Sequence, residues 1–235
     1  MQTDITVFGA GNTGFPVAAN LSLAGFSVSL AELPEFREAI DPVREAQAIE
    51  LRGVARVGVA KIAMITDDVA AAVAASDTLL VIVPAYAHAP WARAIAPYIE
   101  ERHTLTLMPG TLGSLEVHRI FREAGAPPIP VAETDTSPYV CRKTGPAETT
   151  IFGVVPRIGL GVFPASQTGR VHELLTPLFP GIERLPDVLY CGLSAMNPVV
   201  HPPGVLMNAG RIEHSRGEFY FYDEGVTRGV VSAIM

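Results

Sequence analysis

The fold of this 235-residue chain is decided by the stretch Ile5-Thr6-Val7-Phe8-Gly9-Ala10-Gly11-Asn12-Thr13-Gly14. A short β-prone run enters the pattern GxGxxG, and an Ala-rich helical segment is expected directly after it, over 13–24. The first glycine permits a tight turn, the second lets the main chain approach a pyrophosphate, and the third lets the helix pack closely on its strand. The helix N-terminus adds free N–H groups and partial positive charge. Strand, glycine loop and helix in this order predict a dinucleotide-binding unit.

An acidic residue follows at the spacing that such a unit needs. The second expected strand, 27–31, leads into Glu32, about 20 residues beyond the loop, where a carboxylate accepts a hydrogen bond from the adenosine ribose 2′-hydroxyl. A carboxylate there also repels a 2′-phosphate, so NAD is the expected cofactor. Arg37 is near enough in sequence to keep NADP as the alternative. The competing interpretation of Glu32 is a solvated strand end.

The rest of the first half alternates strands with helices, which is typical of a parallel sheet with right-handed crossovers. Further strands are expected at 79–83, 104–108 and 129–132, with helices at 35–48, 67–75, 86–99 and 113–124. The first two of these strands are nearly continuous apolar runs, as expected when helices cover both faces of a sheet. The predicted fold class is therefore α/β, with a Rossmann-type, doubly wound and mostly parallel sheet.

Two loops after these strands are candidate cofactor contacts, because open α/β sheets bind ligands at the carboxyl ends of their strands. The turns Val83-Pro84-Ala85 and Met108-Pro109-Gly110-Thr111 are expected to line the nicotinamide half of the cleft. The residues predicted to bind the cofactor are Gly9, Ala10, Gly11, Asn12, Thr13, Gly14, Glu32, Val83, Pro84 and Ala85.

The composition changes after about residue 126, since 13 of the 20 prolines lie between Pro127 and Pro203. Strands expected at 149–152 and 158–162 would extend the same sheet as antiparallel or edge strands. From Cys191 onward, apolar residues recur at helical spacing. We therefore predict an NAD-binding Rossmann domain over 1–190 and the beginning of a helical substrate domain over 191–235. The apolar run at the end has no polar tail, so we expect this second domain to be truncated.

Composition argues against several classes of protein. The formal net charge is −7 and no block of basic residues occurs, so nucleic acid is not an expected partner. Cys141 and Cys191 have no metal-ligand spacing, and neither a metal site nor a disulfide framework is predicted. The chain opens without a signal-peptide pattern, and its longest apolar stretch, 69–89, is interrupted by polar residues and Pro84. No membrane span is expected, and a cytoplasmic location is predicted.

The candidate catalytic group lies in Asn197-Pro198-Val199-Val200-His201-Pro202-Pro203-Gly204. Asn197 and His201 are four residues apart and share one helical face. The two prolines lack N–H donors, so the helix is expected to kink or stop there, leaving polar backbone beside the pair. Histidine can donate a proton to a carbonyl oxygen during hydride transfer and accept one in the reverse direction. The competing interpretation is an ordinary histidine beside a helix break.

These segments together resemble the octopine/nopaline type of opine dehydrogenase. The resemblance covers essentially the whole chain and is most specific between Asn197 and Glu213. The other segments that carry it are the glycine loop, Val83-Pro84-Ala85, Met108-Pro109-Gly110, and Glu133-Thr134 leading to Cys141-Arg142. It implies an NAD(P)H-dependent oxidoreductase acting on CH–NH groups. Such an enzyme joins the amino group of an amino acid to a 2-oxo acid such as pyruvate and reduces the resulting imine.

The resemblance also assigns roles and partners. It makes His201 the acid/base and Asn197 a substrate or nicotinamide contact. The expected partners are an amino acid, a 2-oxo acid, and a second copy of the chain bound through the helical domain. In the family the helical domain continues well beyond this point and carries an aspartate partner for the histidine, which these residues lack.

Two further functions stay open at this point. A 2-oxo or 2-hydroxy acid reductase of the ketopantoate reductase or glycerol-3-phosphate dehydrogenase kind shares the architecture but usually relies on a lysine from the second domain. The only lysines here are Lys61 and Lys143, and neither lies in a helix after the Rossmann unit, which counts against that function. The other alternative is a dinucleotide-binding module without catalysis.

Overall fold

The computed structural model of the chain describes residues 2–235 and forms two compact units, Met1–Leu193 and Ser194–Met235. The helix α7 (Val188–Ser194) contains both this division and the boundary expected between residues 190 and 191. Within the described residues, no helix is long and apolar enough to cross a membrane.

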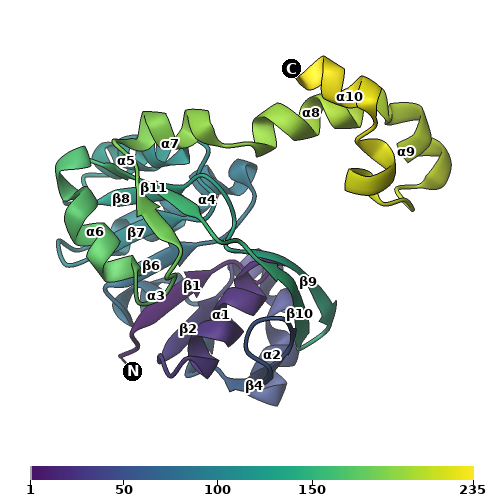
Figure 1. Ribbon diagram of the computed structural model, residues 1–235. Helices are drawn as coiled ribbons and strands as arrows, with labels where there is room; N and C mark the ends of the chain where they lie inside the picture. Colours follow the sequence, from purple (N-terminus) through teal and green to yellow (C-terminus); the bar gives the residue numbers. More distant parts are fainter. Residues whose placement is uncertain (1) are drawn as a thin grey trace. The chain divides into compact units, whose positions relative to one another are not determined.

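The first unit is built on an eight-stranded sheet (Figure 1). Its strands, in chain order, are β1 (Ile5–Phe8), β2 (Val28–Ala31), β5 (Met64–Thr66), β6 (Thr78–Val81), β7 (Thr104–Leu107), β8 (Val131–Thr134), β11 (Ile158–Phe163) and β12 (Ile182–Arg184). They are arranged β12-β11-β8-β7-β6-β1-β2-β5, and every neighbouring pair is parallel except β8 with β11. Because β1 lies between β2 and β6, the strand order reverses at its carboxyl end, where Rossmann folds bind dinucleotides. The predicted fold class is confirmed.

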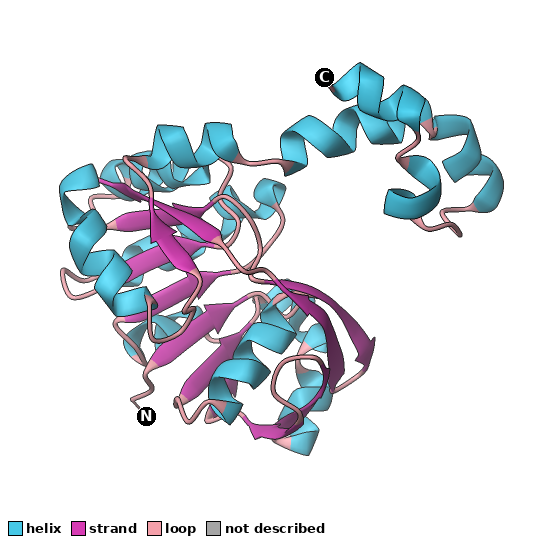
Figure 2. Cartoon of the chain, viewed as in Figure 1, coloured by secondary structure: helices cyan, strands magenta, loops and turns pink. Residues whose placement is uncertain are grey.

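A second, four-stranded sheet was not expected from the sequence (Figure 2). Its order is β4 (Gly58–Lys61), β3 (Ala48–Gly53), β10 (Glu148–Val154) and β9 (Tyr139–Gly145). The strand expected at 149–152 is therefore real, but the prediction that it extends the main sheet is wrong. Thr149 and Ile151 are buried whereas Phe152 and Val154 are exposed, so β10 suits a sheet with one solvent-facing side. The strand expected at 158–162 does join the main sheet, antiparallel to β8.

Helices cover both faces of the main sheet. The longer ones in this unit are α1 (Gly14–Leu23), α2 (Asp41–Ala46), α3 (Val69–Ala74), α4 (His88–Ile95), α5 (Gly113–Glu123), α6 (Thr168–Leu175) and α7. One buried cluster contains Val7 and Phe15 and lies against α1, α6 and the second sheet. The other contains Phe8, Trp91 and Phe121 and lies against α3, α4 and α5. Successive residues of β1 thus supply opposite cores, as alternation along a strand requires.

One expected helix is divided. The segment 35–48 forms a 3₁₀ helix, η1 (Pro34–Ala39), followed by the separate helix α2. Helix α2 ends at Ala46, because the next residue, Gln47, has a left-handed φ of 54° that cannot continue a helix. The first residue of β3 follows directly, so the turn of the chain takes place at this point.

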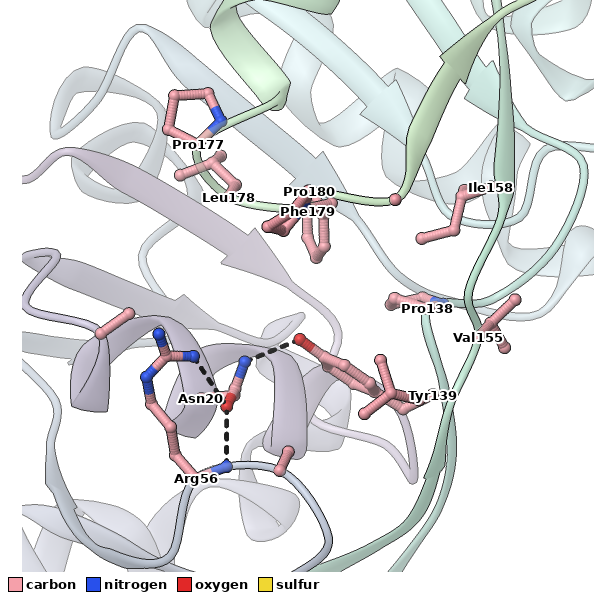
Figure 3. Close-up of a pocket in the computed structure, with 14 residues that line it drawn as sticks. Asn20, Arg56, Pro138, Tyr139, Val155, Ile158, Pro177, Leu178, Phe179 and Pro180 are labelled. Carbon is pink, nitrogen blue, oxygen red and sulfur yellow. Dashed lines mark hydrogen bonds between the residues drawn. The ribbon is translucent and has the colours of Figure 1, made fainter.

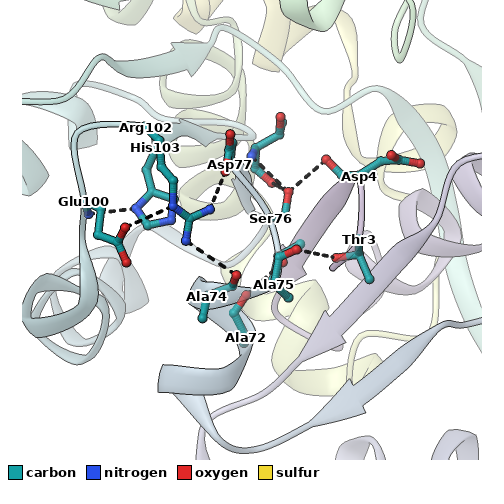
Figure 4. A network of polar contacts seen from close by, with 12 residues as sticks. Thr3, Asp4, Ala72, Ala74, Ala75, Ser76, Asp77, Glu100, Arg102 and His103 are labelled. Atoms are coloured by element: carbon teal, nitrogen blue, oxygen red, sulfur yellow. Dashed lines mark hydrogen bonds and ion pairs between the residues drawn. The ribbon is translucent and has the colours of Figure 1, made fainter. Parts of the chain in front are cut away.

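A network of hydrogen bonds and ion pairs connects the amino ends of β1, β6 and β7 (Figure 4). The Ser76 hydroxyl donates to the carbonyl oxygen of Asp4 at 2.8 Å, and Arg102 forms ion pairs with Asp77 and Glu100. His103 is fully buried, and its Nδ1 accepts the N–H of Glu100 at 2.9 Å. This edge is opposite the carboxyl ends where a ligand would bind, so we assign the network a structural role.

The second unit contains α8 (Asn197–Met207), α9 (Ala209–Ser215), a short π-helix η5 (Phe221–Gly225) and α10 (Arg228–Ile234). A kink or a stop was predicted at Pro202 and Pro203, and the stop does not occur, because α8 continues through both prolines. Proline's fixed φ is itself helical, so the two residues remove hydrogen bonds without ending the helix. Gly204 follows at a crowded position, where a Cβ would lie 2.6 Å from the Phe221 ring.

Candidate cofactor and catalytic sites

The glycine loop connects β1 to α1, and each glycine meets a different steric demand. Gly9 has a φ of +103°, which favours glycine, and a Cβ there would lie 2.5 Å from the Val83 side chain. A Cβ on Gly14 would overlap the carbonyl oxygen of Gly9. A Cβ on Gly11 would meet no atom of the described residues within 4 Å. The protein therefore needs Gly9 and Gly14 for its own packing, whereas the open space at Gly11 is available to a ligand.

Glu32 lies at the end of β2 and faces the glycine loop. Its Oε2 accepts the main-chain N–H of Ala10 at 2.8 Å, and its Oε1 accepts that of Leu33 at 2.9 Å. Burial raises the pKa of this carboxyl, while the two N–H donors act in the opposite direction. A carboxylate has about four lone-pair sites, so it can also accept from a ribose hydroxyl. A solvated strand end, the competing interpretation, does not fit a side chain that is only 8% exposed.

The predicted turn after β6 adjoins this loop. Val83 touches the position of Gly9, and Pro84 and Ala85 lie exposed at the start of a short 3₁₀ helix, η2 (Ala85–Ala87). The structure thus brings the glycine loop, Glu32 and the turn at Val83 together at the carboxyl edge of the sheet.

Sequence reasoning gave no role to His88, which packs between the turns that follow β6 and β7. It is 2% exposed, and its ring lies against Gly113 and near the carbonyl groups of Val83 and Pro109. Burial lowers the pKa of His88. The ring therefore packs between the two turns, and its buried Nε2 has no hydrogen-bond partner among the described residues.

Glu133, at the carboxyl end of β8, is a second residue whose role the sequence did not indicate. Its carboxylate is fully buried and accepts the N–H groups of Leu112 at 2.9 Å and Ser114 at 3.0 Å. A Cβ on Gly110 would overlap the Glu133 side chain. Glu133 therefore caps the N-terminus of α5 and fixes the turn after β7, the second predicted nicotinamide-side loop. Its only sequence signal was an acidic residue within an apolar strand.

The candidate catalytic pair lies in the second unit. Asn197 and His201 are both on α8, four residues apart as expected. The Nε2 of His201 lies 2.6 Å from the hydroxyl of Tyr222, which comes from η5. Because α8 continues through the prolines, His201 lies within a helix rather than beside a break, and its side chain has a tyrosine hydroxyl as its partner.

A cavity of about 330 Å³ opens beside the second half of α1 (Figure 3). The side-chain amide of Asn20 donates to the hydroxyl of Tyr139 at 2.7 Å and accepts from Arg56 at 3.4 Å. Residues 177–181 supply much of its apolar wall. None of the predicted site residues lines this cavity, so it is separate from the glycine-loop site.

Comparisons with known proteins agree with this architecture. Residues 184–235 match the family described as NAD/NADP octopine/nopaline dehydrogenase, alpha-helical domain. The chain is 35% identical over 227 residues to an opine dehydrogenase of Arthrobacter sp. (strain 1C), covering 96% of this chain and 62% of that protein. The chain therefore spans about three-fifths of the length of that relative. These matches confirm the resemblance to the octopine/nopaline type of opine dehydrogenase.

Solved structures share the fold at lower identity. An octopine dehydrogenase in complex with NADH and agmatine has a TM-score of 0.74 at 18% identity, covering 98% of this chain and 60% of that one. A yersinopine dehydrogenase with NADP⁺ bound also has a TM-score of 0.74, at 17% identity, with coverage of 99% and 61%. A ketopantoate reductase from Ralstonia eutropha JMP134 has a TM-score of 0.65 at 16% identity, with coverage of 98% and 70%. The Rossmann-type architecture is common to all of them.

Proposed function

We propose that this chain, a relative of the octopine/nopaline-type opine dehydrogenases, is the cofactor-binding part and the beginning of the helical domain of an NAD(P)H-dependent opine dehydrogenase. The observation that carries the proposal is the 35% identity to an opine dehydrogenase over 96% of the chain. The glycine loop and its buried acidic partner, Glu32, support the proposal because such an enzyme must bind a dinucleotide. Residues 1–190 would hold the cofactor, and residues 191–235 would begin the substrate domain.

The residues fit a dinucleotide. The open space at Gly11 and the N-terminus of α1 would receive the pyrophosphate, with Ala10, Asn12 and Thr13 as the remaining loop contacts. Glu32 would bind the adenosine ribose, which favours NAD, with NADP as the alternative. Val83, Pro84 and Ala85 would line the nicotinamide side.

The reaction proposed is a reductive condensation. The amino group of an amino acid adds to the carbonyl carbon of a 2-oxo acid, water leaves, and the imine is reduced to a secondary amine. When bound, the nicotinamide supplies the hydride. His201 would donate a proton to the departing oxygen and accept one in the reverse direction, while Asn197 would orient the substrate or the nicotinamide carboxamide. A homodimer through the helical domain is a further part of this proposal.

The ketopantoate-reductase type of function is the second candidate, because a solved member shares the fold. Its usual catalytic lysine has no counterpart among the described residues of the helical unit. Lys61 ends β4 and Lys143 lies in β9, both in the second sheet. We therefore rank this candidate below an opine dehydrogenase, with a non-catalytic dinucleotide-binding module third.

Two measurements separate the candidates. Quenching of protein fluorescence measures NADH binding, with Gly11→Val as the matched non-binding control. Oxidation of NADH is then followed with pyruvate alone, and with pyruvate and each of a panel of amino acids. Oxidation that requires both substrates supports an opine dehydrogenase, and oxidation by the oxo acid alone supports the reductase. NADH binding without either reaction supports the module, and absence of binding refutes all three.

A further inference from the structure

Strand β9 of the second sheet runs over the glycine loop. The main-chain N–H of Lys143 donates to the side-chain oxygen of Asn12 at 3.0 Å. The Cys141 thiol, two residues earlier, donates to the carbonyl oxygen of Asn12 at 3.3 Å. Lys143 lies 131 residues after Asn12, which occupies one of the variable positions of GxGxxG. A distant segment of the chain thus holds the glycine loop in place. The backbone of Lys143 is fixed beside the proposed cofactor site.

The side chain of Lys143 continues into the adenosine side of that site. Its ammonium donates to the carbonyl oxygen of Ala39 at 3.1 Å and lies 4.0 Å from the centre of the Phe15 ring. Phe15 directly follows the last glycine of the loop, and Ala39 ends η1, the segment that follows Glu32. The ammonium therefore contacts both the segment that continues from the glycine loop and the segment that follows the acidic residue.

The charge of Lys143 is not taken up by an ion pair. Among residues 2–235, no side-chain carboxylate lies within 4.0 Å of its ammonium. Burial lowers the pKa of Lys143, and the nearby charge of Glu32 acts in the opposite direction. One of its three N–H donors has an acceptor among the described residues, so the other two can bind a ligand.

We propose that Lys143 is a specificity-determining residue of the adenosine subsite, which offsets the charge of Glu32 and binds the 2′-phosphate of NADP. This inference rests on the proposed function, since it needs a dinucleotide on the glycine loop. A carboxylate alone would repel a 2′-phosphate, whereas a carboxylate with a nearby ammonium presents little net charge. The chain then accepts both NAD(H) and NADP(H).

The position of Lys143 distinguishes it from Arg37, the residue that the sequence suggested for this role. Arg37 is exposed on η1 and makes no hydrogen bond from its guanidinium to a described residue. Lys143 is held by three contacts, to Asn12, Ala39 and Phe15. A pre-positioned cation loses less conformational freedom when it binds a phosphate.

The chain offers a matched control because Lys61 and Lys143 are its only lysines. Lys143→Met keeps an apolar stem over Phe15 but removes the charge, and Lys61→Met removes the same charge from exposed β4. We expect Lys143→Met to raise the Kd for NADPH by about 3- to 30-fold, the usual effect of losing a charged hydrogen-bond partner, with a much smaller change for NADH. Lys61→Met should change neither, and Lys143→Arg should keep most of the NADPH affinity.

Each outcome of the titration is decisive. Equal weakening of NADH and NADPH by Lys143→Met would overturn the specificity role and leave Lys143 as a purely structural contact. A wild-type protein that binds NADH but not NADPH would also overturn it, while leaving the proposed function intact. If the wild type binds neither cofactor, the proposed function itself fails. Should Lys143→Met unfold, the NMR measurement that follows still tests the role, because it needs no substitution at Lys143.

A second measurement leaves the side chain and the positive charge of Lys143 in place. Reductive methylation with ¹³C-formaldehyde gives one dimethylamine NMR signal for each lysine and one for the N-terminal amine, and each dimethylated lysine keeps its positive charge. The signal that Lys61→Met removes is that of Lys61, and the N-terminal signal is recognised by its lower pKa, which leaves that of Lys143. Adenosine 2′,5′-bisphosphate should shift the Lys143 signal, whereas AMP, which lacks the 2′-phosphate, should shift it much less. Equal shifts with the two nucleotides would contradict contact with the 2′-phosphate.

Discussion

The main-chain N–H of Ala10 donates a 2.8 Å hydrogen bond to the Glu32 carboxylate, and this bond joins the glycine loop to the end of β2. Both parts of the proposed adenosine subsite are therefore positioned by the protein itself. Glu32→Gln keeps the shape of the side chain but removes its charge. It also replaces one of the two oxygens that accept the N–H groups of Ala10 and Leu33 with an NH₂ group. We expect the Kd for NADH to rise about 10-fold, since a charge-assisted hydrogen bond to the ribose is lost.

NADPH provides the internal control for this variant, because removing the negative charge of Glu32 also removes its repulsion of the 2′-phosphate. Its affinity should stay the same or increase, and fluorescence titration with both cofactors gives the ratio. Parallel weakening of the two would show that Glu32 acts by holding the loop rather than by binding the ribose.

The glycines allow a prediction in which two substitutions three residues apart affect different properties, one the cofactor affinity and the other the stability. Gly11→Ala adds a methyl group to open space, so the free energy of unfolding should change little while cofactor affinity falls sharply. Gly14→Ala places the same methyl group on the carbonyl oxygen of Gly9, so the protein should lose stability by about 1–3 kcal/mol or more. Urea unfolding and NADH titration on both variants make the comparison. A destabilised Gly11→Ala with normal affinity would place the pyrophosphate elsewhere.

Glu133 should be necessary for the stability of the turn after β7. Glu133→Ala leaves the N–H groups of Leu112 and Ser114 without their acceptor in a buried position, which costs about 1–3 kcal/mol for each group. The control is Glu123→Ala, since Glu123 forms an exposed ion pair with Arg119 on α5 and such pairs contribute about 0–1 kcal/mol. Similar unfolding free energies in the two variants, measured in urea, would contradict the capping role of Glu133.

Buried histidines predict a loss of stability on mild acidification. Burial lowers the pKa of His88 and of His103 in the folded protein, whereas both titrate near 6.5 in an unfolded chain. Below about pH 6.5 the unfolded chain binds protons that the folded protein does not, so the free energy of unfolding falls as the pH decreases. The stability that the two neutral, buried histidines contribute is fully present above about pH 6.5. It is lost as the pH falls from there through their lowered pKa values in the folded protein. Urea unfolding between about pH 7.5 and 5.5 measures this slope, and His88→Gln should reduce it. An unchanged slope in that variant would show that His88 does not contribute.

The sequence was sufficient for the parts of the fold that depend on local pattern. The glycine loop, the acidic residue at Glu32 and the apolar strands are each decided within a few residues, and the predicted Rossmann class is confirmed. Strands β3 and β4 were missed because Ile49 and Leu51, the buried positions of β3, alternate with charged residues that also suit a helix. Strand β3 pairs with β4 beside it in sequence and with β10 about 100 residues later, and the second, long-range pairing has no local signal.

The roles of His88 and Glu133 could not be predicted from the sequence for a related reason. Each meets another element of the fold: the His88 ring packs against Gly113, and Glu133 accepts the N–H groups that begin α5. A histidine in a predicted helix and an acidic residue in a predicted strand have no distinctive local signal. The site residues that were predicted are those whose function depends on a motif, whereas the missed ones depend on tertiary contact.

The last prediction concerns His201, which remains the proposed acid/base. Its Nε2 lies 2.6 Å from the Tyr222 hydroxyl, so the ring is held by a partner on another helix of the same unit. If His201 transfers the proton, His201→Asn should lower turnover by about 10²- to 10⁴-fold, the usual contribution of a positioned general acid or base, while the Kd for NADH changes little. Tyr222→Phe removes only the orienting hydroxyl and should therefore have a much smaller effect, about 10-fold or less. NADH oxidation with pyruvate and the amino acid that supports the fastest rate gives both values. Near-normal turnover in His201→Asn would remove this residue from the mechanism, and a larger effect from Tyr222→Phe than from His201→Asn would transfer the proton-donor role to the tyrosine.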